Sequence, residues 1–358
     1  MLISPTKINL ICRFMMKVNQ ILNCSFDKWY HLFENITIKS EIIPIPKNVL
    51  DYLRINSTII LPKSCQIEMD TECKYRKEER RRNFDDSDDS WDEEEEDKNY
   101  PDFREFDEIL KEKLKTFSNK VFIKLNWSSP KDAFWVLNKL SCCSLSDIYM
   151  LLKSSDFISH DLNQAFSQCE DNEEMRQTID SFEYKLIMRE WVNINPSMEF
   201  RCFVNKDRLV GISQRECRSF YQILLDGRNE MMQRIEYFFA EKIQGKFLDE
   251  SFVFDVCLGK KSIKLLDFNP FCSKTDSLLY SWEELSDENL VLNSTNYKSH
   301  NLELRLIETN IGVQSSTYSM YSQPKDALDL NEFNLQDLTN LPSLIQKNIE
   351  TQIGEELD

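Results

Sequence analysis

Glycine is scarce in this chain of 358 residues, and its scarcity excludes two common nucleotide-binding motifs. Only six glycines occur, at positions 211, 227, 245, 259, 312 and 354, and no two of them lie closer than 14 positions. A GxGxxG fingerprint or a Walker P-loop needs several glycines within about eight residues. Both motifs are therefore absent.

Histidines are few, and the cysteines do not form closely spaced pairs. The three histidines (31, 160 and 300) form no HExxH pattern, and no GxSxG elbow, HRD or DFG motif is present. We interpret each as an ordinary structural or surface histidine. The eleven cysteines include no CxxC pair, so a disulfide framework or zinc ribbon is disfavoured and reduced, mostly buried thiols are expected.

The chain also has no excess of positive charge and no long apolar run. Lys and Arg number 44 against 61 Asp and Glu, which gives a net charge of -17. Such a charge repels phosphate backbones, so we expect no nucleic-acid partner. The apolar stretch Ile8 to Met16 is short and interrupted by Arg13, and is neither a membrane span nor a signal peptide. We expect a cytoplasmic, monomeric protein without a membrane partner, because nothing suggests a coiled coil.

Composition divides the chain into segments. Hydrophobic residues make up 41%, enough for a sizeable core, but 74–82 holds six basic residues and 85–97 holds ten acidic ones. Opposite charge blocks with few aliphatics are typical of a disordered insertion. The predicted organisation is an extension (1–16), the N-terminal part of a first lobe (17–70), the charged insertion (71–101), the first lobe (102–180), a second lobe with a metal site (181–330) and an acidic tail (331–358).

Periodicity predicts a mixed α/β protein. Apolar residues at 103, 106, 110, 114 and 117 follow helical spacing, and one apolar stripe fills the segment between Gly227 and Gly245. Ser129 to Asp132 has the pattern of a helix start, with Ser as N-cap and Pro at N1. Strands are expected in these segments: 36–38, 42–46, 121–125, 184–189, 199–204, 209–214, 252–258 and 263–268.

The last two strands carry the most informative pattern. Asp255 interrupts an apolar strand, and Asp267 and Asn269 lie two apart on its partner, hence on one face. With a turn near Lys261, Asp255 faces Asp267, and two carboxylates so close need a cation or a shared proton. Two carboxylates and an amide oxygen suit Mg²⁺. Alternatively, one Asp faces solvent and the other caps the turn at Pro270.

Basic residues on strands form a second set. Lys124 interrupts one apolar run and Arg189 ends another. Glu199 and Arg201 share one face, and Arg215 follows the strand expected to pair with them. Cations on the floor of a cleft could hold a polyphosphate without a glycine-rich loop. Taken singly, each is more often a solubility residue on an edge strand.

Several of these segments resemble the cell division cycle protein 123 family. The matching stretches are CSFDKWY (24–30), VFIKLNWSSPKDAFWV (121–136), LSDIYMLLKSSDFI (145–158), LIMREWVNINPSMEFRCFV (186–204), LVGISQRE (209–216), KFLDESFVFDV (246–256), LLDFNPFCSKTDSLLYSWEEL (265–285) and, less closely, QPKDALDL (323–330). The resemblance implies an ATP-grasp-like fold with two lobes and mostly antiparallel sheets enclosing a nucleotide cleft. It also implies an assembly chaperone that acts on the gamma subunit of eukaryotic translation initiation factor 2, and thereby on translation initiation and cell-cycle progression.

The resemblance further implies roles for individual residues. Lys124 and Arg201 would neutralise phosphates with Arg215 nearby, and Glu199 would hold the ribose or orient Arg201. The implied lining of the nucleotide pocket is Trp127, Ser129, Pro130 and Asp132. The segment implied to face the adenine is Arg189, Glu190, Trp191 and Val192. The implied Mg²⁺ ligands are Asp255, Asp267 and Asn269. The implied cofactors are ATP and Mg²⁺.

Two other functions stay open at this stage. An ATP-grasp ligase or kinase would need a substrate pocket and usually a mobile covering loop, and neither abundant glycine nor an obvious general base supports one. An acidic scaffold with a vestigial cleft would be indifferent to the loss of Asp267. We therefore favour a nucleotide-dependent binding protein and assign no catalytic residue.

Overall fold

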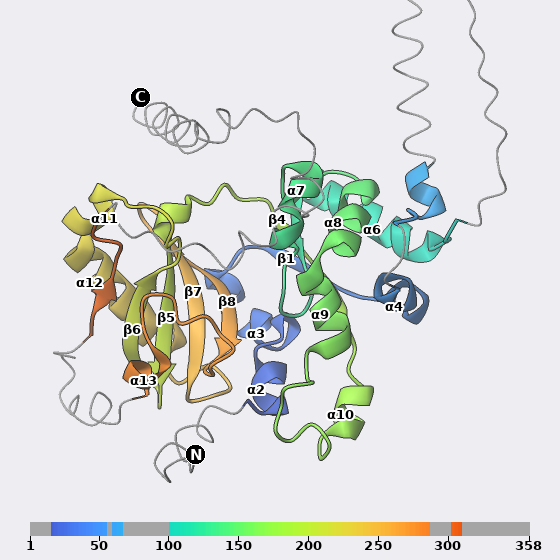
Figure 1. Cartoon of the computed structure of the whole chain (residues 1–358). Helices are drawn as coiled ribbons and strands as arrows, with labels where there is room; N and C mark the ends of the chain where they lie inside the picture. The colour runs from blue at the N-terminus through green and yellow to red at the C-terminus, as the bar shows by residue number, and fades with distance from the viewer. Residues whose placement is uncertain (1–15, 56–58, 67–99, 287–301, 310–358) are drawn as a thin grey trace, which may run out of the picture. The chain divides into compact units, whose positions relative to one another are not determined.

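Two β-sheets organise the protein (Figure 1). The computed structural model describes residues 16–55, 59–66, 100–286 and 302–309, all within the unit Met1–Ser316. Nearly all of the predicted N-terminal extension and charged insertion, and the whole acidic tail, lie outside the described residues. The predicted α/β class with mostly antiparallel sheets is confirmed.

The small sheet has four strands in the order β1-β4-β2-β3, and every neighbouring pair is antiparallel. The large sheet has five strands in the order β8-β7-β5-β6-β9, antiparallel except for the β6–β9 pair. The strands are β1 (Ser40–Pro44), β2 (Val121–Lys124), β3 (Ser141–Cys142), β4 (Lys185–Glu190), β5 (Glu199–Asn205), β6 (Arg208–Gln214), β7 (Phe252–Leu258), β8 (Ile263–Pro270) and β9 (Leu304–Arg305).

Helices α4 (Lys47–Arg54), α6 (Arg104–Thr116), α8 (Leu145–Ser154) and α9 (Asp156–Gln164) contribute to the core of the small sheet. The predicted helical stripe is confirmed, because Phe106, Leu110 and Leu114 of α6 are buried in one cluster with Val121 and Ile123 of β2. Burial of such a stripe stabilises a surface helix more than its intrinsic propensity does.

The large sheet packs one face against α12 (Arg228–Phe238), which continues as a π-helical turn, Phe239–Ile243. The apolar stripe predicted between Gly227 and Gly245 lies in this core, with Ile235 and Ile243 fully buried. Helix α3 (Phe26–Phe33) joins the same cluster through aromatic contacts with Phe268 of β8. The opposite face of the sheet carries the charged residues described below.

The remaining helical segments are short. They are α2 (Val18–Asn23), η1 (Glu34–Ile36), η2 (Lys131–Ala133), α7 (Phe134–Leu137), α10 (Arg176–Asp180), η3 (Pro196–Met198), α11 (Gln222–Asp226) and α13 (Trp282–Leu285). The β5–β6 hairpin turns through Lys206 and Asp207, both with positive φ (53° and 58°), as two-residue hairpin loops require.

Two sequence expectations need correction. The segment 36–38 is not a strand: Ile36 ends the turn η1, and only Thr37 makes a β-bridge, with Leu265. The segment after Ser129 begins as the 3₁₀ turn η2 with Pro130 at its N-cap, so Ser129 is not a capping residue. In addition, β4 belongs to the small sheet, so the chain passes between the sheets after Glu190, while the lobe boundary expected at residue 181 stays a prediction.

The described helices include none that is long and apolar enough to cross a bilayer. All nine described cysteines are free thiols, and six of them are buried. The expectation of reduced, mostly buried thiols is therefore confirmed for this part of the chain.

Candidate functional site

Three charged residues lie side by side on the face of the large sheet opposite α12. Arg201 of β5 pairs in register with Asp255 of β7, and Asp255 pairs with Asp267 of β8, as the hairpin pattern predicted. Arg201 donates from Nε to Asp255 Oδ1 at 2.8 Å and from Nη2 to Oδ2 at 2.9 Å. This two-pronged ion pair is almost fully buried, with side chains 7% and 4% exposed.

A second arginine supports the same carboxylate. Arg215 Nε lies 3.3 Å from Asp255 Oδ2 and 3.7 Å from Glu199 Oε2. Burial alone would raise the pKa of Asp255, but the attraction of Arg201 and then Arg215 outweighs burial and lowers that pKa to about 2. Asp255 is therefore a permanent anion held between two cations.

The small sheet supplies the cation for the other aspartate. Lys124, at the end of β2, places Nζ 2.5 Å from Asp267 Oδ2, and its side chain is only 2% exposed. Burial lowers the pKa of Lys124 although Asp267 attracts its proton. The ammonium also lies 5.3 Å from the ring centre of Phe26. The carboxylate pair that the sequence predicted to need a cation thus has protein cations on both members.

Arg189 of β4 is the second buried cation from the small sheet. It donates from Nη1 to the carbonyl oxygen of Leu266 at 2.9 Å and from Nη2 to Thr37 Oγ1 at 3.2 Å. Its Nε is buried without a hydrogen-bond partner. Burial lowers the pKa of Arg189 to about 10 although Asp267 opposes this effect.

Lys131 also belongs to this site. From the sequence, it was expected only to form part of a helix start. It is the first residue of η2, and much of its residue surface is exposed. Its pKa is lowered by burial and then by Arg215, whereas Glu199, Asp255 and Asp267 raise it, so the charge of Lys131 is coupled to theirs. The position of this lysine, just after the loop that follows β2, is the sequence feature that could have indicated its place in the site.

These contacts define one charged cluster in which cations outnumber carboxylates. Its members are the cations Lys124, Lys131, Arg189, Arg201 and Arg215 and the carboxylates Asp161, Glu199, Asp255 and Asp267. A local excess of positive charge in a chain of net charge -17 favours a bound anion with several charges. Residues from both sheets take part, and the cleft that the sequence predicted between such strand cations stays a prediction.

The metal set remains a prediction. Asn269 lies two residues beyond Asp267 on β8, in register with Val253 rather than with Asp255. Among the described residues, no three His, Cys, Asp or Glu side chains are grouped as metal ligands.

Two of the residues predicted to line the nucleotide pocket make structural contacts. Asp132 accepts hydrogen bonds from Ser155 Oγ (2.6 Å) and from the backbone N–H groups of Asp156 (2.7 Å) and Phe157 (3.3 Å), so it caps α9. Trp127 donates from Nε1 to the carbonyl oxygen of Ile21 at 2.8 Å. Both carboxylate oxygens of Asp132 are therefore engaged away from the charged cluster.

The other predicted lining residues are placed as follows. Trp127 stacks on Phe182 with ring centres 5.1 Å apart. Ser129 is half-buried and Pro130 is buried, and both directly precede Lys131. They therefore adjoin the cluster along the chain, and their contact with a nucleotide remains a prediction.

The segment predicted to face adenine continues from Arg189. The Glu190 N–H donates to the carbonyl oxygen of Lys39 at 2.9 Å. The ring of Trp191 lies 5.4 Å from the ammonium of Lys120, and the side chain of Val192 is 46% exposed. This segment leads from the small sheet toward β5, and its role toward a base remains a prediction.

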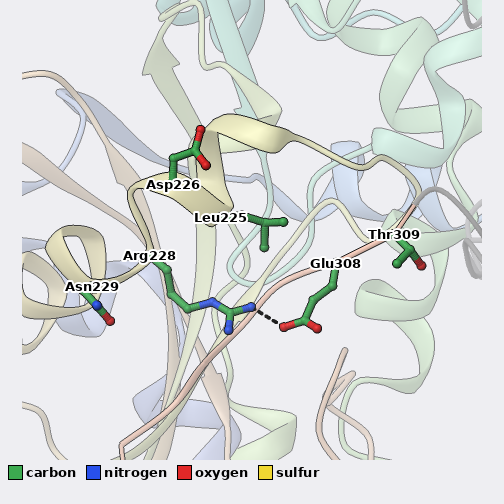
Figure 2. Close-up of a pocket in the computed structure, with 6 residues that line it drawn as sticks. All are labelled: Leu225, Asp226, Arg228, Asn229, Glu308 and Thr309. Atoms are coloured by element: carbon green, nitrogen blue, oxygen red, sulfur yellow. Dashed lines mark hydrogen bonds and ion pairs between the residues drawn. The ribbon is translucent and has the colours of Figure 1, made fainter.

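A separate open pocket lies outside the charged cluster. Figure 2 shows its lining, which comprises Leu225, Asp226, Arg228, Asn229, Glu308 and Thr309. Its most prominent contact is an ion pair between Arg228 Nη2 and Glu308 Oε1 at 2.5 Å. None of the predicted site residues contributes to it. We favour the charged cluster as the site, because buried and mutually paired charges are more specific evidence than an open depression.

Comparisons with known proteins are consistent with this arrangement. A family model described as D123 matches residues 29–331. The "Translation initiation factor eIF2 assembly protein" of Xenopus tropicalis is 39% identical over 324 residues, which cover 88% of this chain and 93% of that protein. The protein of the same name from Danio rerio is 38% identical over 322 residues, covering 88% of this chain and 90% of that protein.

A solved structure has a similar fold. Cdc123 from Schizosaccharomyces pombe matches with a TM-score of 0.64 and 33% identity, over 83% of this chain and 100% of that one. This likeness confirms the predicted ATP-grasp-like fold class.

Proposed function

Because this chain belongs to the D123 family, we propose that it is an assembly factor for the translation initiation factor eIF2 that binds ATP and Mg²⁺ at the charged cluster. Relatives named as eIF2 assembly proteins align over nearly their whole lengths, which supports the same role here. The finer parts of the proposal concern the nucleotide, the client subunit and the coupling between them.

The charged cluster is the observation that carries the nucleotide part. Its excess of cations fits a triphosphate, and its carboxylates fit the metal ion that accompanies one. The buried Nε of Arg189 is a donor without a partner beside this cluster, which also fits a polar ligand. Strand cations thereby replace the glycine-rich loop that the chain lacks.

The residues divide into three groups toward such a ligand. Lys124, Lys131, Arg201 and Arg215 would hold phosphate oxygens, while Asp255, Asp267 and Asn269 would hold the metal ion. Glu199 would bind the ribose or orient Arg201, and the segment from Arg189 to Val192 would face the base. Bound Mg²⁺ would neutralise phosphate charge that the carboxylates otherwise repel.

The client part of the proposal names the gamma subunit of eIF2. The cluster joins both sheets through Lys124 and Asp267, so a ligand bound there would fix one arrangement of the surfaces around it. A client that recognises this arrangement would bind only the nucleotide-loaded protein. A binding role of this kind needs no catalytic residue.

Calorimetric titration of the full chain with MgATP tests the nucleotide part. We expect Lys131→Ala to weaken binding roughly tenfold, because an amine–phosphate bond contributes about 1.5–3 kcal/mol. Lys131 is preferable to the buried cations, since its residue surface is largely exposed and its loss should leave the fold intact. Lys260→Ala, an exposed lysine in the β7–β8 turn, is the matched control. Equal affinities for both variants and the wild type would contradict the proposed site.

Affinity capture from a eukaryotic lysate tests the client part. We expect the wild type to retain the eIF2 gamma subunit with MgATP present and to retain less of it after nucleotide removal. With MgATP present, Asp267→Ala should reduce retention to the level seen after nucleotide removal, whereas Lys260→Ala should not. Retention that ignores both nucleotide and Asp267 would leave the partner in place but remove the nucleotide coupling. Release of ADP with a phosphorylated or ligated small molecule would favour the ligase or kinase instead.

A further inference from the structure

Thr37 lies at the point where the chain passes between the two sheets. It forms a parallel β-bridge with Leu265 of β8, and β1 of the small sheet begins three residues later at Ser40. Its side chain is buried, with 3% of the residue exposed. Its hydroxyl donates to the carbonyl oxygen of Leu265 at 2.7 Å.

The same hydroxyl also accepts a hydrogen bond. Arg189 Nη2 donates to Thr37 Oγ1 at 3.2 Å, while Arg189 Nη1 donates to the carbonyl oxygen of Leu266 at 2.9 Å. Leu265 and Leu266 directly precede Asp267 on β8. One buried hydroxyl therefore links β4 of the small sheet to the stretch of β8 that carries Asp267.

We propose that Thr37 is a positioning residue for the nucleotide site, which holds the Arg189 guanidinium on the β8 backbone and away from the Asp267 carboxylate. This inference rests on the proposed nucleotide function. Thr37 has no charge and lies outside every matched motif that suggested a ligand contact, so no sequence pattern pointed to it.

The charges around Arg189 explain why such a residue is needed. Lys124 repels Arg189, and Asp267 attracts both cations. Lys124 forms the short ion pair with Asp267, whereas Arg189 is held by a carbonyl and a hydroxyl instead. Without the hydroxyl, Nη2 would join Nε as a buried donor lacking a partner, at a cost that favours rotation toward Asp267. Arg189 would then compete with Lys124 for the carboxylate.

Three single variants of the full chain test this role by titration with MgATP. Thr37→Val keeps the shape but removes the hydroxyl, and we expect its affinity to fall roughly tenfold. Thr37→Ser keeps the hydroxyl and should restore affinity to within about threefold of the wild type. Ser40→Ala is the matched control, because Ser40 is also buried and its hydroxyl donates only to the carbonyl oxygen of Ile38, at 2.8 Å.

A double-mutant cycle separates positioning from general loosening. If Thr37 acts through Arg189, Thr37→Val should have no further effect on affinity in an Arg189→Met background. Wild-type affinity in Thr37→Val, an equal loss in Ser40→Ala, or additive losses in the double variant would each overturn the inference. These outcomes are read only if the wild type binds MgATP; failure of the wild type to bind would overturn the proposed nucleotide function itself.

Discussion

Replacing Asp255 with Asn should strongly destabilise the fold, even without nucleotide or divalent cation. The substitution keeps the shape of the side chain but removes the charge that Arg201 and Arg215 share. Arg201 would then be a cation without a carboxylate partner in a buried site, because Asp255 and Arg201 are 4% and 7% exposed, whereas Arg215 would keep Glu199 at 3.7 Å. Removing one member of a buried ion pair typically costs about 3–5 kcal/mol.

The pKa of Asp255 gives an independent lower estimate of the same effect. Folding lowers this pKa from 3.8 to about 2, which corresponds to about 2 kcal/mol of stability. Since the folded pKa lies below the unfolded one, this stability is present above pH ~4 and is lost as the pH falls toward ~2. The Asn variant should lack this part of the acid dependence.

Asp267→Asn provides the matched comparison. Asp267 is 26% exposed, so water already screens part of its charge, and the ring of Phe26, with its centre 5.3 Å from the Lys124 ammonium, still faces the lysine when the carboxylate is lost. We expect a cost of about 1 kcal/mol, well below that of Asp255→Asn.

Urea unfolding followed by tryptophan fluorescence at pH 7, with chelator present, measures both costs. Equal stability of Asp255→Asn and the wild type would refute the reasoning. Such a result would mean that the repulsion between the two aspartates offsets the attraction between Asp255 and the arginines.

Two further predictions concern other positions. Gly211→Ala should lower stability by about 1–3 kcal/mol, because the added Cβ would lie 2.8 Å from Cζ of Tyr280, whereas Gly227→Ala meets no atom closer than 3.4 Å and should be milder in a thermal melt; similar melting temperatures would contradict this. Burial raises the pKa of Asp161 to about 6 although Ser128 donates two hydrogen bonds to it. The folded protein thus binds this proton more tightly than the unfolded chain does. The stability of the wild type relative to Asp161→Asn should therefore fall by about 3 kcal/mol between pH 4 and 6, and a constant difference would count against it.

Much of the large sheet could be predicted because its signals are local. The hairpin and the partner of Asp255 were readable from the sequence, but the register is not set by the turn alone: Val256 pairs with Leu265, and a bulge at Leu266 then brings Asp267 opposite Asp255. The helix α6 was equally readable from its apolar spacing. These features depend on neighbours close in sequence.

What the sequence did not reveal depends on distant contacts. Asp132 has the position of a helix-start residue in its own segment, yet it caps α9 more than twenty residues away. The β-branched residues around Thr37 suggested a strand, but partners on β8 and β4 decide their geometry. Lys131 was overlooked because its importance comes from Glu199, Asp255 and Asp267, which reach it only through folding.

The order of strands in the small sheet has a consequence for how the protein is made. β1 pairs only with β4, so Ser40 has no strand partner until Arg189, far later in the chain, has been synthesised. During synthesis, the ribosome must release all of α6, α8 and α9 before this sheet can close. Until then the edges of β1 and β2 are open to pairing with other chains. The emerging polypeptide of a factor proposed to assist the assembly of others therefore passes through a stage at which it is itself prone to aggregate.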